Sequence, residues 1–283
     1  MRIGYAFTPQ GKEFVFSSRD SVDWVSTSQL GLSINDFTHM VNSLDRIDEL
    51  LTVTKSDILG SEAKLMAPVP APGKILAIGH NYLAHVAEVG KEVPTEPYVF
   101  GKYVNSLCGP EDPVEYPQGL STQLDYECEL AVIIGKRTKN VDEEQGMESV
   151  FGYAVANDIS TRDLQKTLGQ ISLSKGMDSF CPMGPWLTTK NDVSDPQKLK
   201  VQSHVNGEPR QNGNTSDMVF SVAQLVAYIS RFVTLNIGDI ILTGTPAGVG
   251  MGFEPPRFLE EGDVITCSIA ELGSISNQIV GNQ

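Results

Sequence analysis

The sequence predicts a strand-rich α+β protein, and three observations support this prediction. The chain of 283 residues contains 26 glycines and 16 prolines, which favours many turns over a bundle of long helices. Short apolar runs of strand length outnumber segments with a helical period. Prolines at positions 68, 70 and 72 favour an extended connection, so we expect a small N-terminal α/β domain over residues 1–68 and a larger domain over residues 69–283.

The elements follow from the local patterns. In the first part, residues 14–16 are typical of a strand, and residues 30–51 have the apolar spacing of a helical region. The strands expected in the second part cover residues 74–78, 127–134, 151–156, 239–243, 264–270 and 275–280. The expected helices cover residues 82–89, 160–168 and 218–232. The second of these begins with Ser160 as N-cap and Asp163 three residues later, a capping-box pattern. Asn206-Gly207 predicts a hairpin turn.

Charge and composition exclude several classes of partner. The formal net charge of −14 and the pI of about 4.7 argue against nucleic acid and against an anionic membrane surface. A small anionic substrate stays possible, because a local cluster of bases can dominate inside a cleft. We see no apolar run of about 18 residues and no signal-peptide pattern, and the four cysteines show no zinc spacing. A cytoplasmic enzyme with free thiols is the expectation.

Acidic residues on two neighbouring strands form a candidate metal site. Glu127 and Glu129 begin a strand and share one face, with roughly 7 Å between them at about 3.3 Å per residue. Asp158 stands where the next strand ends. Converging carboxylates suit a hard divalent cation such as Mg²⁺ or Mn²⁺. The alternatives are a solvated strand face for the two glutamates and a helix cap or turn for the aspartate.

His85 and Glu88 form a candidate acid–base pair. If residues 82–89 are helical, positions i and i+3 lie on one face, and the carboxylate then orients the imidazole as a proton acceptor. The alternative is an ordinary surface pair. A glycine-rich segment at residues 244–252 lacks the Gly-Lys-Ser/Thr ending of a P-loop, although its backbone amides could bind an anionic group.

These stretches, in this order, resemble the fumarylacetoacetate hydrolase superfamily from about residue 72 to residue 269. The motifs that carry the resemblance are Gly79-His80-Asn81-Tyr82 with His85 and Glu88; residues 125–132, DYECELAV; residues 157–165, NDISTRDLQ; Lys175-Gly176-Met177-Asp178 with Gly184-Pro185; residues 205–208, VNGE; and residues 238–250, GDIILTGTPAGVG. Two departures stand out, His80 beside the expected site and Tyr103 after Lys102, where proline is expected.

The resemblance implies a fold, a cofactor and an assembly. It implies the family's mixed β-sandwich roll, usually a homodimer, with a small N-terminal domain. It implies Mg²⁺ or Mn²⁺ on Glu127, Glu129 and Asp158, and a lid that carries His85 and Glu88. The most similar branch is that of acylpyruvases and oxaloacetate decarboxylases.

The activity implied is hydrolysis of a C–C bond in a small acylpyruvate or other 1,3-dicarbonyl oxo-acid, through a metal-bound enolate. His85 and Glu88 would activate water, with Lys175 as a further catalytic group. Substrate contacts are expected from four residues, which are Lys102, Arg162, Gln165 and Thr245. The alternatives are an oxaloacetate (β-keto acid) decarboxylase on the same metal site, an isomerase or tautomerase, and a non-catalytic relative.

Overall fold

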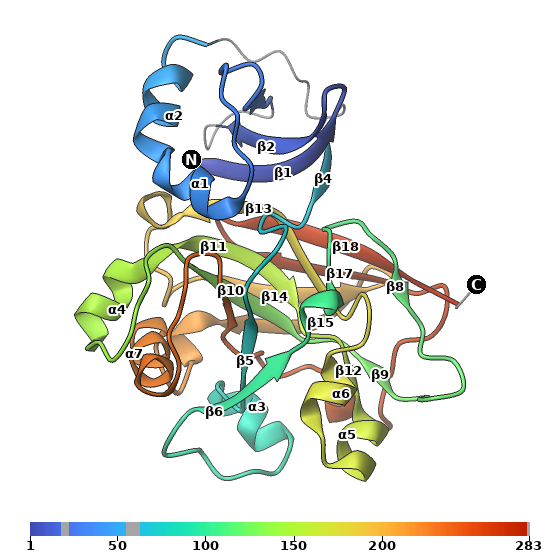
Figure 1. The fold of residues 1–283 in the computed structure, drawn as a ribbon. Coiled ribbons are helices and arrows are strands. Elements are labelled where there is room, and N and C mark those ends of the chain that lie inside the picture. The colour runs from blue at the N-terminus through green and yellow to red at the C-terminus, as the bar shows by residue number, and fades with distance from the viewer. Residues whose placement is uncertain (18–22, 55–62, 282–283) are drawn as a thin grey trace.

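The computed structural model describes residues 1–17, 23–54 and 63–281, and it confirms a strand-rich α+β fold (Figure 1). Its larger sheet has the strand order β3-β2-β1-β13-β11-β10-β16-β5-β6, with β4 paired to β1 and β7 paired to β13. These strands are β1 (Arg2–Thr8), β2 (Gly11–Ser17), β3 (Val25–Ser26), β4 (Lys64–Met66), β5 (Ile75–Gly79), β6 (Tyr98–Lys102), β7 (Leu107–Cys108), β10 (Cys128–Ile134), β11 (Val150–Asn157), β13 (Cys181–Thr189) and β16 (Ile240–Leu242).

A second sheet packs against one face of the first, in the order β15-β14-β17-β18-β8. Its strands are β8 (Val114–Glu115), β14 (Lys200–Val205), β15 (Glu208–Asn214), β17 (Val264–Ile269) and β18 (Gly273–Val280). A separate two-stranded pair consists of β9 (Leu124–Asp125) and β12 (Ser160–Thr161). Asn206 and Gly207 join β14 to β15 with φ of 52° and 81°, so the predicted hairpin turn is confirmed.

Helices are short and lie outside the sheets. They are α1 (Phe37–Asn42), α2 (Leu44–Leu51), α3 (Leu83–Glu88), α4 (Glu143–Ser149), α5 (Arg162–Leu168), α6 (Ile171–Lys175) and α7 (Val222–Phe232), with 3₁₀ turns at Val104–Ser106, Lys190–Asp192, Thr215–Asp217 and Gly250–Gly252. The helical region expected over residues 30–51 is two short helices, and residues 30–36 are not helical. None of the helices in the described ranges is long and apolar enough to cross a membrane.

The prediction that Ser160 caps a helix is wrong. Ser160 pairs with Asp125 in the small sheet, and its hydroxyl donates to the carbonyl of Asp158 at 3.0 Å. The helix begins two residues later, and the Asp163 carboxylate accepts from the Ser121 hydroxyl at 2.5 Å. Neither side chain therefore makes the hydrogen bonds of a capping box: Ser160 bonds to a nearby carbonyl and Asp163 to a distant serine. A true capping box occurs at Ser221 and starts α7.

Strand β10 lies in the middle of the molecule because apolar groups cover both of its faces. Leu130 and Val132 belong to the core between the two sheets. Ala131 and Ile133 belong to a second core, which the N-terminal elements close with Phe14 and other large side chains. A continuously buried strand of this kind is a rigid support for side chains at its end.

The N-terminal strands extend the large sheet. Arg2 and Ile3 of β1 pair with Thr188 and Leu187 of β13, and β1 also pairs with β2 and β4. Figure 1 shows these elements at one end of the molecule and α3, β6, α5 and α6 at the other. The domain boundary at residue 68 stays a prediction. The elements around the candidate site come from the second part of the chain.

Candidate functional site

Three carboxylates converge at the ends of two paired strands. Glu127 immediately precedes β10, Glu129 is the second residue of β10, and Asp158 follows β11. The antiparallel register sets Asp158 beside Glu127, with its amide donating to the Glu127 carbonyl at 2.9 Å. One oxygen of each of the three carboxylates lies within 4.8 Å of the others, and all three residues are buried. The sequence-based expectation of a shared face therefore corresponds to a tight acidic cluster.

Two lysines neutralise part of this cluster. Lys175, the last residue of α6, places Nζ 2.9 Å from Glu127 Oε2 and 2.9 Å from Asp158 Oδ2. Lys102, the last residue of β6, donates to Asp158 Oδ1 at 2.6 Å and also to the carbonyl oxygens of Ile159 and Lys175. All three protons of Lys102 thus have protein acceptors. Its geometry supports a role in holding Asp158, while substrate binding by Lys102 stays a prediction.

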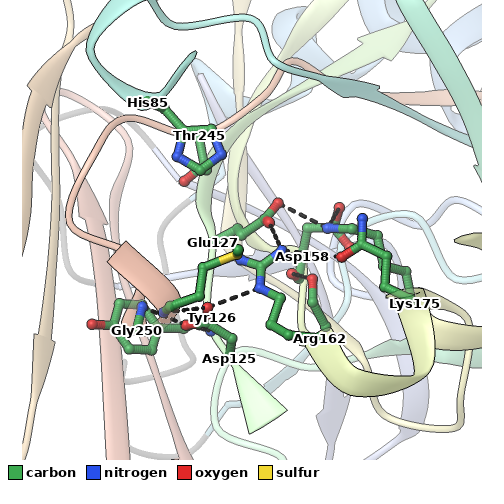
Figure 2. A network of polar contacts seen from close by, with 12 residues as sticks. His85, Asp125, Tyr126, Glu127, Asp158, Arg162, Lys175, Thr245 and Gly250 are labelled. Carbon is green, nitrogen blue, oxygen red and sulfur yellow. Dashed lines mark hydrogen bonds and ion pairs between the residues drawn. The ribbon is translucent and has the colours of Figure 1, made fainter. Parts of the chain in front are cut away.

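Arg162 connects the acidic cluster to the glycine-rich segment (Figure 2). Its Nη1 lies 2.7 Å from Glu127 Oε1, and its Nε donates to Asp125 Oδ2 at 2.8 Å. Asp125 in turn accepts from the amides of Gly250 and Met251 at 2.6 and 3.0 Å. The anions bound by this segment are therefore side chains of the protein itself.

The electrostatics of the cluster fit a divalent cation. The three carboxylates of the cluster and the neighbouring Asp125 are buried together with the cations Lys102, Arg162 and Lys175, which leaves an excess of one negative charge. Burial, followed by the charges of Asp158 and Glu127, raises the pKa of Glu129 well above its usual range. Burial opposes ionisation of Glu127 as well, but Lys175 and Arg162 hold its pKa below the usual range. A hard divalent cation bound by these oxygens would balance the excess negative charge and so favour the ionised form of Glu129.

The His85–Glu88 pair is present and is anchored to the glycine-rich segment. His85 Nδ1 lies 2.9 Å from Glu88 Oε2, and Glu88 Oε1 accepts from the Gly248 amide at 2.8 Å. Gly252 leaves the space for this carboxylate, because a Cβ there would lie 2.2 Å from Glu88 Oε1. Since Nδ1 faces Glu88, the other ring nitrogen, Nε2, is left for the cavity. Figure 2 shows His85 and Thr245 on the side of Glu127 opposite to Asp125.

A cavity of about 780 Å³ opens over this arrangement. Its lining includes six of the predicted site residues, which are His85, Glu127, Arg162, Gln165, Lys175 and Thr245, and it also includes His80. Gln165 accepts from Arg162 Nη1 at 3.4 Å. The Thr245 hydroxyl donates to the Cys128 carbonyl and accepts from Gln211 Nε2. The cavity is large enough for a small oxo-acid.

Sequence reasoning assigned no role to two side chains that build this site. Asp125 orients Arg162, and a signal was available in the glycine-rich segment, whose amides need an anionic partner. Gln211 is buried in the second sheet and contacts Thr245 and the backbone of Cys128 and Pro246. Nothing in its sequence neighbourhood indicates these contacts, because they join segments more than 30 residues apart.

The chain is similar in sequence and structure to several known proteins. The model of the fumarylacetoacetate (FAA) hydrolase C-terminal family matches residues 74–280. The chain is 50% identical over 222 residues to oxaloacetate tautomerase fahd2, mitochondrial, of Xenopus laevis, a match that covers 78% of this chain and 69% of that protein. It is 48% identical over 222 residues to oxaloacetate tautomerase YisK of Bacillus subtilis, a match that covers 77% and 74%. Maleylpyruvate hydrolase from Sphingobium, solved with manganese(II) and pyruvate, aligns over both whole chains with a TM-score of 0.83 and 31% identity.

Proposed function

The chain belongs to the fumarylacetoacetate hydrolase family, and from this premise we propose that it is a metal-dependent tautomerase, which interconverts the keto and enol forms of oxaloacetate or a similar small 2-oxo acid. The resemblance found in the sequence and the expected roll are thereby confirmed. The observation that carries the proposal is the geometry of one base. His85 is buried in the cavity wall, held by Glu88, with the acidic cluster across the same cavity.

Glu127, Glu129 and Asp158 would hold the divalent ion, Mg²⁺ or Mn²⁺, for which they offer three hard oxygen donors. Such an ion would polarise the 2-oxo group of the substrate and make the neighbouring C–H more acidic. Manganese in the maleylpyruvate hydrolase relative supports this assignment. Lys175 and Arg162 supply further positive charge beside Glu127, and both line the cavity.

The proton transfer falls to His85. Its Nε2 takes the proton from carbon 3 of the keto acid, and the electron pair of that C–H bond moves toward the oxygen on carbon 2. The resulting imidazolium returns the proton to that oxygen and gives the enol. Glu88 stabilises the imidazolium through Nδ1 and keeps the ring in one orientation during both transfers. Only a C–H bond breaks and an O–H bond forms, while the double bond moves from C2=O to C2=C3, so the pair needs no water.

Hydrolysis of an acylpyruvate is the second candidate, since the same His85–Glu88 pair can deprotonate water instead of carbon. The maleylpyruvate hydrolase relative, solved with pyruvate, favours it. We place it second because curated relatives near 50% identity are named oxaloacetate tautomerases. Decarboxylation of oxaloacetate would use the same chelating head and is measured in the same experiment.

The test follows all three reactions in parallel with Mg²⁺, with Mn²⁺ and with a chelator. A dehydrogenase that reduces only the keto acid reports the conversion of enol-oxaloacetate, while pyruvate release reports decarboxylation and acetylpyruvate loss reports hydrolysis. We expect metal-dependent tautomerisation that falls by roughly 10²-fold or more in His85→Ala. His39→Ala, which changes an exposed histidine of α1, serves as the matched control. Equal rates in His85→Ala and wild type would reject the proposed base, and faster acetylpyruvate cleavage would put hydrolysis first.

A further inference from the structure

His80 is held in an unusual backbone conformation at the cavity wall. It follows β5 with φ of 58°, in the left-handed region that few non-glycine residues adopt. The next residue, Asn81, is buried and fixes this turn. Asn81 Nδ2 donates to the carbonyls of Phe220 and Thr243, and Asn81 Oδ1 accepts from the Phe220 amide. The conformation of His80 is therefore imposed by its neighbours, and its side chain lines the cavity.

The imidazole of His80 has ring neighbours but no polar partner in the described part of the chain. Its centroid lies 6.4 Å from that of His85, at an interplanar angle of 22°, and 6.2 Å from that of Tyr98. Nδ1 is buried and has no hydrogen bond with any described residue. A buried N–H without an acceptor costs more than a buried lone pair, so the proton belongs on Nε2.

The surroundings of His80 favour the neutral imidazole, which donates one hydrogen bond. Burial lowers the pKa of His80, and the neighbouring His85 lowers it further. The ring is partly exposed while Nδ1 is buried, so its accessible edge is the one that carries Nε2. The Nε2–H of His80 therefore lies at the cavity beside the proposed base, where an acceptor of a bound ligand can accept its hydrogen bond.

The cavity also has a cation on this side. Lys91 follows α3, lines the same cavity and is exposed, and its charge acts on His80. The cations Lys175 and Arg162, by contrast, are already paired with carboxylates of the acidic cluster. Lys91 and Lys166, which also lines the cavity, have no ion-pair partner among the described residues, and of these two only Lys91 acts on the charge of His80. A donor and an unpaired cation at one wall match a carboxylate of the ligand.

We propose that His80 is a specificity-determining residue, whose Nε2–H binds the second carboxylate of a dicarboxylic 2-oxo acid with support from Lys91. This inference rests on the proposed function only in placing the chelating end of the ligand at the acidic cluster. The chemical class it names is a short dicarboxylate with an oxygen on carbon 2. The corresponding monocarboxylic acids bind without this contact.

The experiment uses a stable ligand pair, so that binding is measured without turnover. Malate and 2-hydroxybutyrate share the same chelating head, and they differ only in a carboxylate that is replaced by methyl. Dissociation constants of both are measured by calorimetry on the manganese-loaded protein. The wild type should prefer malate by at least 10-fold, since a hydrogen bond to a charged group contributes about 1.5–3 kcal/mol, or roughly 10–100-fold.

In His80→Asn the preference for malate should fall by roughly 10-fold while 2-hydroxybutyrate binding is unchanged. Asparagine tolerates the left-handed backbone, and His80→Gly is the second variant should His80→Asn fold poorly. Lys91→Met should also reduce the preference, and His39→Asn is the matched control. An undiminished preference in the folded His80 variants, equal loss for both ligands, or no preference in the wild type would overturn the inference.

The outcomes separate this inference from the proposed function. Loss of preference in His80→Asn without oxaloacetate turnover by the wild type would keep the subsite and reject the tautomerase. Turnover with an unchanged preference would keep the tautomerase and reject the role of His80. The manganese affinity of each variant, measured in the same titration series, shows whether the acidic cluster is intact.

Discussion

Replacing Asp125 by asparagine tests how the site is held together. The Asp125 carboxylate is fully buried and accepts from Arg162 Nε and from the amides of Tyr126, Gly250 and Met251, at 2.6–3.0 Å. Asparagine keeps the size of the side chain but removes its charge, and it turns an NH₂ group toward groups that are themselves donors. Arg162 then keeps a single carboxylate for a buried guanidinium, because its other ion-pair partner is Glu127.

The expected cost follows from the burial of this pair. Removing one partner of a buried ion pair costs about 3–5 kcal/mol, which at about 2 °C per kcal/mol lowers Tm by roughly 6–10 °C. Thermal unfolding, followed by circular dichroism on the metal-free protein, measures this change. The control is Asp195→Asn, whose carboxylate pairs with the exposed Lys198 at 2.9 Å and should cost less than about 1 kcal/mol. The reasoning is refuted if the two variants melt within about 2 °C of each other.

Three further predictions concern the base, the metal and acid stability. Gly252→Ala should displace Glu88 and lower kcat by at least roughly 10-fold, while the metal affinity stays unchanged. Gly101→Ala is the control and should have little effect, because a Cβ there meets no atom closer than 3.9 Å. Glu129→Gln should weaken manganese binding by at least roughly 10-fold in calorimetry, and unchanged affinity would remove it from the ligand set. Partial burial opposes ionisation of Asp163, but hydrogen bonds from a serine hydroxyl and backbone amides lower its pKa. The ionised Asp163 carboxylate therefore stabilises the fold fully above the unfolded pKa of about 3.9, and this contribution is lost as the pH falls through the lower pKa of the folded state. Asp163→Asn lacks this contribution, so its Tm should fall less than that of the wild type on acidification.

Local patterns in the sequence indicated the three acidic residues, but they left a solvated strand face and a helix cap as alternatives, and only the family resemblance favoured a metal site. The alternation along β10 puts Glu127 and Glu129 on one face, and the strand-to-turn change at Asp158 marks the end of the next strand. The expected strands of the second part occur within a few residues of their predicted bounds, because short apolar runs and the turn residues that flank them act locally. The same holds for the hairpin at Asn206-Gly207.

Contacts between distant segments could not be predicted in this way. Ser160 has the local appearance of a cap, but pairing with Asp125 takes its backbone into a strand. The orientation of Arg162 depends on Asp125, 37 residues away, and on amides of the segment after β16. The continuation of the large sheet into β1 also depends on pairing across more than 180 residues. Such pairings are decided by the packing of the whole molecule.

The position of Lys175 sets the charge that a cation meets at the acidic cluster. Its ammonium group bridges Glu127 and Asp158, so a cation that enters shares these two carboxylates with a resident positive charge. A singly charged ion such as sodium or potassium gains no Coulombic advantage over that ammonium group, whereas a doubly charged ion does. We therefore expect the ammonium group of Lys175 to disfavour monovalent ions at these carboxylates more strongly than divalent ones.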